Sequence, residues 1–119
     1  MGSKNEFANV EKIKEHFENS TENQLRGNST PAAINNYAQF ILEKLQISEG
    51  RILDVGCGDG RIMEQIQKIN PKLSIDGVEL TSSLSNTARL LNPKSEIFNQ
   101  NAINLYSKKK YDRIFSFSF

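Results

Sequence analysis

The stretch that decides the fold is residues 52–62, ILDVGCGDGRI. It opens with a short, mostly apolar run that is typical of a strand buried on both faces of a sheet. Gly56, Gly58 and Gly60 then alternate with other residues, which predicts a sharp turn whose backbone a ligand can approach closely. An amphipathic helix follows, so the free N–H groups of the turn face the carboxyl end of the strand. We expect a small-ligand site there.

A carboxylate further along the chain extends this prediction. Glu79 follows Gly60 by 19 residues and stands at the end of the next predicted strand. A carboxylate at that position can accept hydrogen bonds from both hydroxyls of a ribose. The glycine turn and Glu79 together indicate a cofactor that carries a nucleoside.

The spacing of the glycines disfavours a dinucleotide cofactor. The dinucleotide fingerprint G-x-G-x-x-G would need its third glycine where this chain has Arg61. Asp54 and Asp59 would also place negative charge beside a pyrophosphate. NAD and FAD are therefore disfavoured, and an NAD-dependent oxidoreductase is kept only as an alternative that NADH binding would reveal.

The rest of the chain alternates predicted helices and strands. Apolar residues at helical spacing predict helices over residues 10–17, 31–45, 62–69 and 84–91. Apolar runs predict strands over residues 51–55, 73–80, 95–99 and 111–119. Residues 18–29, rich in Asn, Ser and Thr, and the lysines at 108–110 predict loops. This alternation indicates an α/β fold with a parallel sheet and right-handed crossovers.

Composition narrows the class of protein further. The chain has 119 residues, 15 Lys and Arg against 14 Asp and Glu, and a net charge of +1, which favours one domain at most. The near-zero charge argues against a large nucleic-acid interface. No run is apolar enough for a membrane span or a signal peptide, and Cys57 is the only cysteine. We therefore expect a cytoplasmic protein without an internal disulfide or a metal site.

The pattern D-x-G-x-G-x-G at residues 54–60 resembles the first motif of the class I S-adenosylmethionine-dependent methyltransferases, among them the type 11, 12 and 25 domains. The resemblance covers residues 51–119. It implies a Rossmann-like, doubly wound parallel sheet, of which this chain supplies the first four strands in the order 3-2-1-4. The complete family fold has seven strands. Two N-terminal helices precede the sheet, so we divide the chain into a helical cap, residues 1–47, and a truncated cofactor-binding domain, residues 48–119.

The resemblance also implies a cofactor, S-adenosylmethionine or its product S-adenosylhomocysteine, and a role for each matching residue. Asp54 would orient the methionyl amine. Gly56 and Gly58 would present their backbone to the methionine part. Glu79 would bind the ribose hydroxyls, and Leu80 would pack on the adenine.

Further members of the expected site follow the same pattern. The family usually has an Asp before Ala102, where this chain has Asn101, whose amide oxygen can still accept a hydrogen bond from the adenine amino group. Ser116 would line the methionyl side, and Gly60 completes the turn. Cys57 is expected to be a small filler within the turn, not a nucleophile. The sequence points to no catalytic base.

The last predicted strand raises the question of what lies beside it. Phe115, Phe117 and Phe119 would share one face of this strand. An aromatic strand at an open edge can pair with another chain. We expect the chain to be a fragment of a longer protein, with completion by a partner or self-association as alternatives. The isolated chain is then expected to show little or no turnover.

The activity implied by the resemblance is transfer of the sulfonium methyl group to an O, N, S or C acceptor, for which the protein mainly supplies alignment. The neutral charge favours a small-molecule acceptor over a nucleic acid. A function of a different class stays open. In that alternative the chain is a non-catalytic Rossmann-like module that docks a partner through its open sheet edge.

Overall fold

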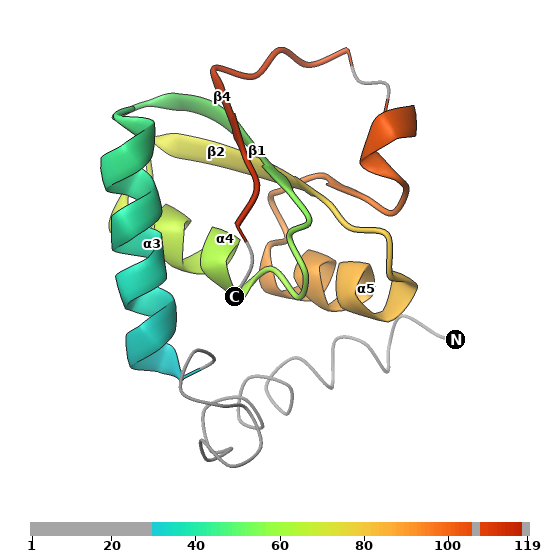
Figure 1. Ribbon diagram of the computed structural model, residues 1–119, viewed down its shortest axis with the longest axis horizontal. Coiled ribbons are helices and arrows are strands. Elements are labelled where there is room, and N and C mark those ends of the chain that lie inside the picture. The colour runs from blue at the N-terminus through green and yellow to red at the C-terminus, as the bar shows by residue number, and fades with distance from the viewer. Residues whose placement is uncertain (1–29, 106–107, 118–119) are drawn as a thin grey trace.

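A computed structural model describes residues 30–105 and 108–117 of the chain (Figure 1). The predicted helix over residues 10–17 and the predicted loop over residues 18–29 lie outside the described residues. The described elements are, in chain order, α3 (Pro31–Leu45), β1 (Gly50–Val55), α4 (Arg61–Ile69), β2 (Leu73–Val78), α5 (Ser82–Leu91), β3 (Ile97–Phe98), the 3-10 helix η2 (Ala102–Asn104) and β4 (Arg113–Phe115).

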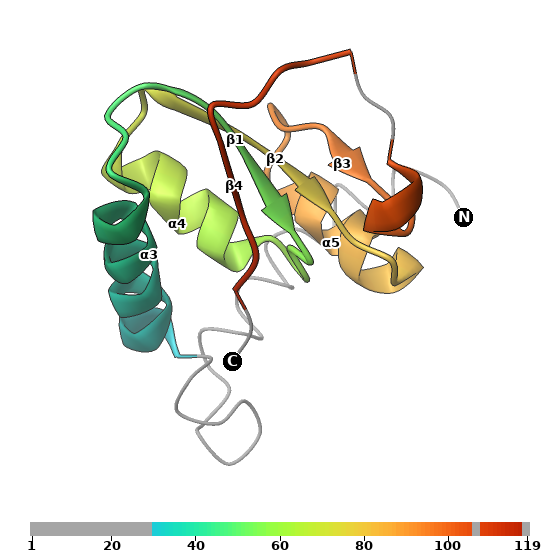
Figure 2. The ribbon, with the colours of Figure 1, turned by 45° about the horizontal axis from the view of Figure 1, so that its top comes forward.

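The described strands form one parallel sheet in the order β3-β2-β1-β4 (Figure 2). This confirms the expected order. Asp54 on β1 lies beside Gly77 on β2 and Phe115 on β4, which fixes the register of the three strands. The chain moves outward from β1 to β2 and β3 and then returns to the other side of β1. The direction of winding therefore reverses between β1 and β4, the place where open α/β sheets bind ligands at the carboxyl ends of their strands.

In the described part of the chain, the helices α3, α4 and α5 pack on one face of this sheet (Figure 1). The side chain of Thr30 accepts a hydrogen bond from the amide of Ala33, and Pro31 occupies the first helical turn, so α3 begins as the sequence predicts. Ile34 of α3 and Ile66 of α4 join Ile52 of β1 in one buried core. Ala88 of α5 and Ile75 of β2 extend the same core. Alternate side chains of β1 and β2 therefore face the helices and pack against them.

The connection from β3 back to β4 crosses the opposite face. Asp76 is 5% exposed and alternates with Ile75 and Gly77, which face the helices. Its carboxylate accepts hydrogen bonds from the Tyr111 hydroxyl at 2.8 Å and from Lys109 Nζ at 3.1 Å. Lys109 was expected in a plain loop, yet it also pairs with Glu96 at 3.0 Å, and the two carboxylates raise its pKa. These contacts attach the return connection to the sheet.

Several elements differ in length from the sequence prediction. β2 ends at Val78, so Glu79 and Leu80 lie in the turn between β2 and α5 and not in the strand. α5 begins two residues earlier than expected, at Ser82. β3 and β4 are shorter than expected because each lies at an edge of the described sheet, with one neighbouring strand to pair with. Among the described residues, no helix has the length and apolar character to cross a membrane.

Candidate functional site

The turn after β1 is built on three glycines with left-handed backbone. Their φ angles are +79° at Gly56, +60° at Gly58 and +82° at Gly60, a region that residues with a side chain rarely adopt. The amides of Gly56 and Cys57 both donate to the carbonyl of Val78, at 2.8 and 3.0 Å. The turn is therefore held against the end of β2, and the alternating glycines are a requirement of its shape.

The three glycines have different surroundings. Among the described residues, a Cβ at Gly58 would meet nothing within 4 Å, and one at Gly56 would meet only Ser116 Oγ at 4.0 Å. A Cβ at Gly60 would lie 2.6 Å from Asn92 Nδ2 and 2.9 Å from the Cα of Ala88. Gly56 and Gly58 therefore leave room for a ligand, whereas Gly60 allows the turn to pack closely on α5.

The carboxylate of Glu79 faces this open part of the turn. Its Oε1 accepts a hydrogen bond from the amide of Gly58 at 2.8 Å, and its Oε2 accepts one from the amide of Thr81 at 3.0 Å. An ionised carboxylate offers about four acceptor positions, so about one remains on each oxygen. Glu79 is thus fixed by backbone groups and still has two acceptor positions beside the turn.

Two further carboxylates give the turn a negative character. Asp54 is 3% exposed. Burial, and secondly the charge of Glu79, raise the pKa of Asp54 to about 7. Burial also raises the pKa of Asp59, whose Oδ1 accepts a hydrogen bond from the amide of Arg61 at 3.2 Å. The arrangement favours a cationic ligand over an anionic one.

Cys57 points away from this open space. It is buried in the main core, and a Cβ at Gly77 would lie 2.6 Å from its sulfur. The Cys57 side chain therefore packs against the last residues of β2. Burial, followed by the charges of Asp54 and Glu79, raises the pKa of the Cys57 thiol to about 12. A thiol in this environment is a packing group and not a nucleophile.

One member of the site was missed by sequence reasoning. The side-chain amide of Asn99, just after β3, donates to the carbonyls of Glu79 and Leu80, both at 3.0 Å. Its Oδ1 accepts a hydrogen bond from the hydroxyl of Ser82 at 3.0 Å. The only sequence signal was that Asn99 is the last residue of a predicted strand, and that Glu79 stands near the end of another. Leu80 is 67% exposed and therefore available to a ligand.

The remaining predicted residues divide into two groups. Ser116 follows β4 and lies next to Gly56, so the structure brings it to the turn. Asn101 instead uses its Oδ1 to accept a hydrogen bond from the amide of Ile103 at 3.0 Å, and thereby caps η2, which begins at Ala102. Contacts of Asn101 and Ala102 with an adenine stay a prediction.

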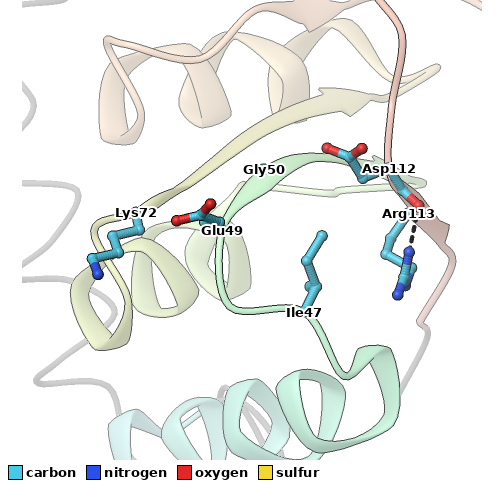
Figure 3. A pocket seen from close by; sticks show the side chains of 6 residues that line it. All are labelled: Ile47, Glu49, Gly50, Lys72, Asp112 and Arg113. Carbon is cyan, nitrogen blue, oxygen red and sulfur yellow. Dashed lines mark hydrogen bonds between the residues drawn. The ribbon is translucent and has the colours of Figure 1, made fainter.

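A separate pocket lies at the other end of β1 (Figure 3). Asp112 accepts a hydrogen bond there from the amide of Arg51 at 2.9 Å, and Arg113 donates to the carbonyl of Leu45 at 2.9 Å. The first contact joins the start of β1 to the residue before β4, and the second joins β4 to the end of α3. The pocket is lined by Ile47, Glu49, Gly50, Lys72, Asp112 and Arg113. Because it lies at the amino ends of the strands, it is distinct from the glycine turn.

A parallel sheet of this order, with a glycine turn after its first strand and a carboxylate after its second, defines a Rossmann-like nucleotide-binding domain. The family model of the methyltransferase small domain matches residues 8–117. The chain therefore belongs to this family of class I S-adenosylmethionine-dependent methyltransferases.

Individual relatives agree with this assignment. The chain is 31% identical over 77 residues to the putative methyltransferase 235L of Invertebrate iridescent virus 6, covering 64% of this chain and 29% of that protein. Two solved structures show the same fold. One is CalS10, an amino pentose methyltransferase from Micromonospora echinaspora with bound S-adenosylmethionine, at 20% identity and a TM-score of 0.63 over 71% of this chain and 36% of that one. The other is the plantazolicin methyltransferase BpumL with S-adenosylhomocysteine, at 23% identity and a TM-score of 0.59 over 89% and 40%. The chain spans less than half the length of each relative.

Proposed function

We propose that the glycine turn binds S-adenosylmethionine and that the protein transfers the methyl group of this cofactor to an acceptor. The observation that carries the proposal is the placement of Glu79. Its carboxylate is held by two backbone amides and keeps about two acceptor positions, which match the two hydroxyls of a ribose. The open space at Gly58 gives a nucleoside access to that carboxylate.

The charges around the turn support this cofactor over a dinucleotide. S-adenosylmethionine carries a sulfonium and an ammonium group, and Asp54, Asp59 and Glu79 surround the turn with carboxylates. Asp54 lies near the end of β1 and is 3% exposed, so a cationic ammonium group would be an oppositely charged partner for its carboxylate. A pyrophosphate would meet repulsion at the same place. The residues present therefore fit the methyl donor.

We assign roles to the chain's residues on this basis. Asp54 binds the methionyl amine, the backbone at Gly56 and Gly58 contacts the methionine part, and Glu79 binds the ribose. When bound, the cofactor supplies an electrophilic methyl group, and the protein's contribution is to hold it in line with the acceptor. The other proposed contacts are Leu80, Asn101 and Ala102 around the adenine, Ser116 on the methionyl side, and Cys57 and Gly60 as packing residues of the turn.

The acceptor and the compartment extend the proposal. The names of the solved relatives describe methyltransferases for an amino pentose and for plantazolicin, and the net charge of this chain is only +1. We therefore propose a small-molecule acceptor and not a nucleic acid. The single cysteine supports a reducing compartment, for which we propose the cytoplasm.

Calorimetric titration of the 119-residue chain with S-adenosylhomocysteine tests the cofactor. We expect saturable binding by the wild type and at least about tenfold weaker binding by Glu79→Ala, because charge-assisted hydrogen bonds to the ribose are lost. Glu49→Ala, at the far end of β1, is the matched control and should bind as the wild type does. Absence of binding, or tighter binding of NADH, would overturn the proposal.

The exposed edge of β4 favours one further candidate function, a partner-docking module. Ile114 is 62% exposed on β4, an edge strand of the described sheet. Edge strands with exposed apolar residues can pair with another strand. Light scattering separates the candidates: a stable dimer that does not bind S-adenosylhomocysteine supports docking, whereas a monomer that binds it supports the methyltransferase.

A further inference from the structure

Asn99 connects three segments that surround the proposed ribose site. It follows β3, whereas its partners Glu79 and Leu80 lie in the turn after β2, and its third partner Ser82 begins α5 (Figure 2). Both carbonyls require a donor, so the amide nitrogen must face them and the amide oxygen must face the Ser82 hydroxyl. The orientation of the side chain is therefore determined by its partners.

Both the amide and the carbonyl of Glu79 form hydrogen bonds with the β3 segment. Its amide donates to the carbonyl of Phe98 at 2.9 Å, and its own carbonyl accepts from Asn99 at 3.0 Å. The next carbonyl, that of Leu80, accepts from the same amide group. Two consecutive peptide groups are thus fixed by one side chain, and with them the direction in which the Glu79 side chain leaves the turn.

We propose that Asn99 is a positioning residue that holds the Glu79 carboxylate in place for recognition of the ribose hydroxyls. This inference rests on the proposed function. Asn99 itself contacts backbone and Ser82, so its effect on the ligand passes through Glu79. Loss of the amide frees the turn, and the carboxylate then spends less time in the position where Gly58 and Thr81 hold it.

The consequence is specific to one part of the ligand. A displaced Glu79 weakens hydrogen bonds to the ribose hydroxyls but leaves the contacts of the methionine part with the glycine turn unchanged. Asn99 therefore sets the preference for ribose over 2′-deoxyribose. Because the side chain is exposed and packs in no core, its removal leaves the fold intact.

The experiment compares S-adenosylhomocysteine with its 2′-deoxyribose analogue by calorimetric titration. We expect the wild type to prefer the ribose form by at least about tenfold, because a hydroxyl bonded to a carboxylate is replaced by hydrogen. Asn99→Ala should weaken binding of S-adenosylhomocysteine by about five- to tenfold and weaken binding of the analogue by a smaller factor, because the analogue keeps only the 3′-hydroxyl as a partner for Glu79. Asn86→Ala, an exposed asparagine on α5 that bonds to Arg89, is the matched control and should keep the wild-type preference.

A second variant covers the case in which Asn99→Ala alters the fold. Ser82→Ala removes only the hydroxyl that orients the amide of Asn99 and should lower the ribose preference by a smaller factor in the same direction. Circular dichroism and the midpoint of thermal unfolding are recorded for each variant.

The possible results distinguish a failure of the Asn99 proposal from a failure of the proposed cofactor binding. If the wild type binds neither ligand, the proposed function fails. If the wild type prefers the ribose form and both variants keep that preference, Asn99 is not a positioning residue. An equal loss for the two ligands assigns Asn99 a general structural role and likewise overturns the inference.

Discussion

The amide of Gly58 donates a hydrogen bond of 2.8 Å to the carboxylate of Glu79, although 21 residues separate them along the chain. Gly58 lies in the turn after β1 and Glu79 in the turn after β2, so the bond joins two neighbouring strand ends. Within residues 30–105 and 108–117, a Cβ at Gly58 would meet no atom within 4 Å, so this bond borders the space proposed for the cofactor.

Gly58→Ala should reduce ligand binding more than stability. The left-handed φ of +60° disfavours alanine, which lowers the free energy of unfolding by about 1–2 kcal/mol, but no atom of the described part of the chain obstructs the new methyl group. The methyl group enters the space proposed for the cofactor. We expect at least about tenfold weaker binding of S-adenosylhomocysteine in a calorimetric titration. Undiminished affinity would place the ligand elsewhere.

Gly60→Ala should have the opposite balance and mainly destabilise the fold. The new methyl group would overlap with Asn92 and with the backbone of Ala88, and the φ of +82° adds strain. Overpacking and backbone strain together should lower the free energy of unfolding by about 2–5 kcal/mol. Urea denaturation measures this loss. If Gly60→Ala is as stable as Gly58→Ala, α5 can shift away from the turn at little cost in free energy, and the prediction is wrong.

Asn92→Asp should also destabilise the protein strongly. The amide of Asn92 donates to the carbonyls of Gly60 at 2.9 Å and Ala88 at 3.1 Å, and the side chain is 3% exposed. An aspartate would turn a buried carboxylate towards two carbonyl oxygens. We expect a loss of about 3 kcal/mol or more at pH 7 in chemical denaturation. Asn36→Asp, on the exposed side of α3, is the control and should change the stability by less than about 0.5 kcal/mol.

Asp54→Asn should stabilise the protein at neutral pH. In the folded state the pKa of Asp54 is about 7, above the ordinary value of 3.8, so the folded protein binds this proton more tightly than the unfolded chain does. The contribution of protonated Asp54 to the free energy of unfolding is complete below about pH 4 and is lost as the pH rises to about 7. The loss corresponds to about 4 kcal/mol, because one pKa unit equals about 1.4 kcal/mol.

Denaturation curves of Asp54→Asn and the wild type between pH 4.5 and pH 8 measure this difference. The variant's advantage should grow with pH and level off above pH 7. A constant difference across the range would mean that Asp54 is ionised in the folded state throughout.

The local elements of the fold could be predicted because each has a periodic or short-range signal. Thr30 and Pro31 mark the start of α3, and the alternating glycines after Val55 mark a turn that the structure shows to need left-handed backbone. The strand order 3-2-1-4 came from the resemblance to a family, and the sheet confirms it. These features depend on residues that are close together in the sequence.

Contacts between distant segments could not be predicted. Lys109 pairs with Asp76, 33 residues away, and Asn99 binds the carbonyl of Glu79, 20 residues away. A single lysine or asparagine in a loop has no periodicity, so its sequence context does not indicate a partner. For a related reason, β2 ends two residues before its predicted end and α5 begins two residues before its predicted start. The Glu79 carboxylate accepts a hydrogen bond from the amide of Thr81 and closes a turn between the two elements.

The absence of a side chain at Gly60 couples the position of the glycine turn to that of α5. At this point the glycine turn rests directly on the main chain of α5, and the side-chain amide of Asn92 donates a hydrogen bond to the carbonyl of Gly60. No long side chain lies between them to absorb a displacement. A displacement of α5 would therefore move the glycine turn with it, because the two segments are in direct contact.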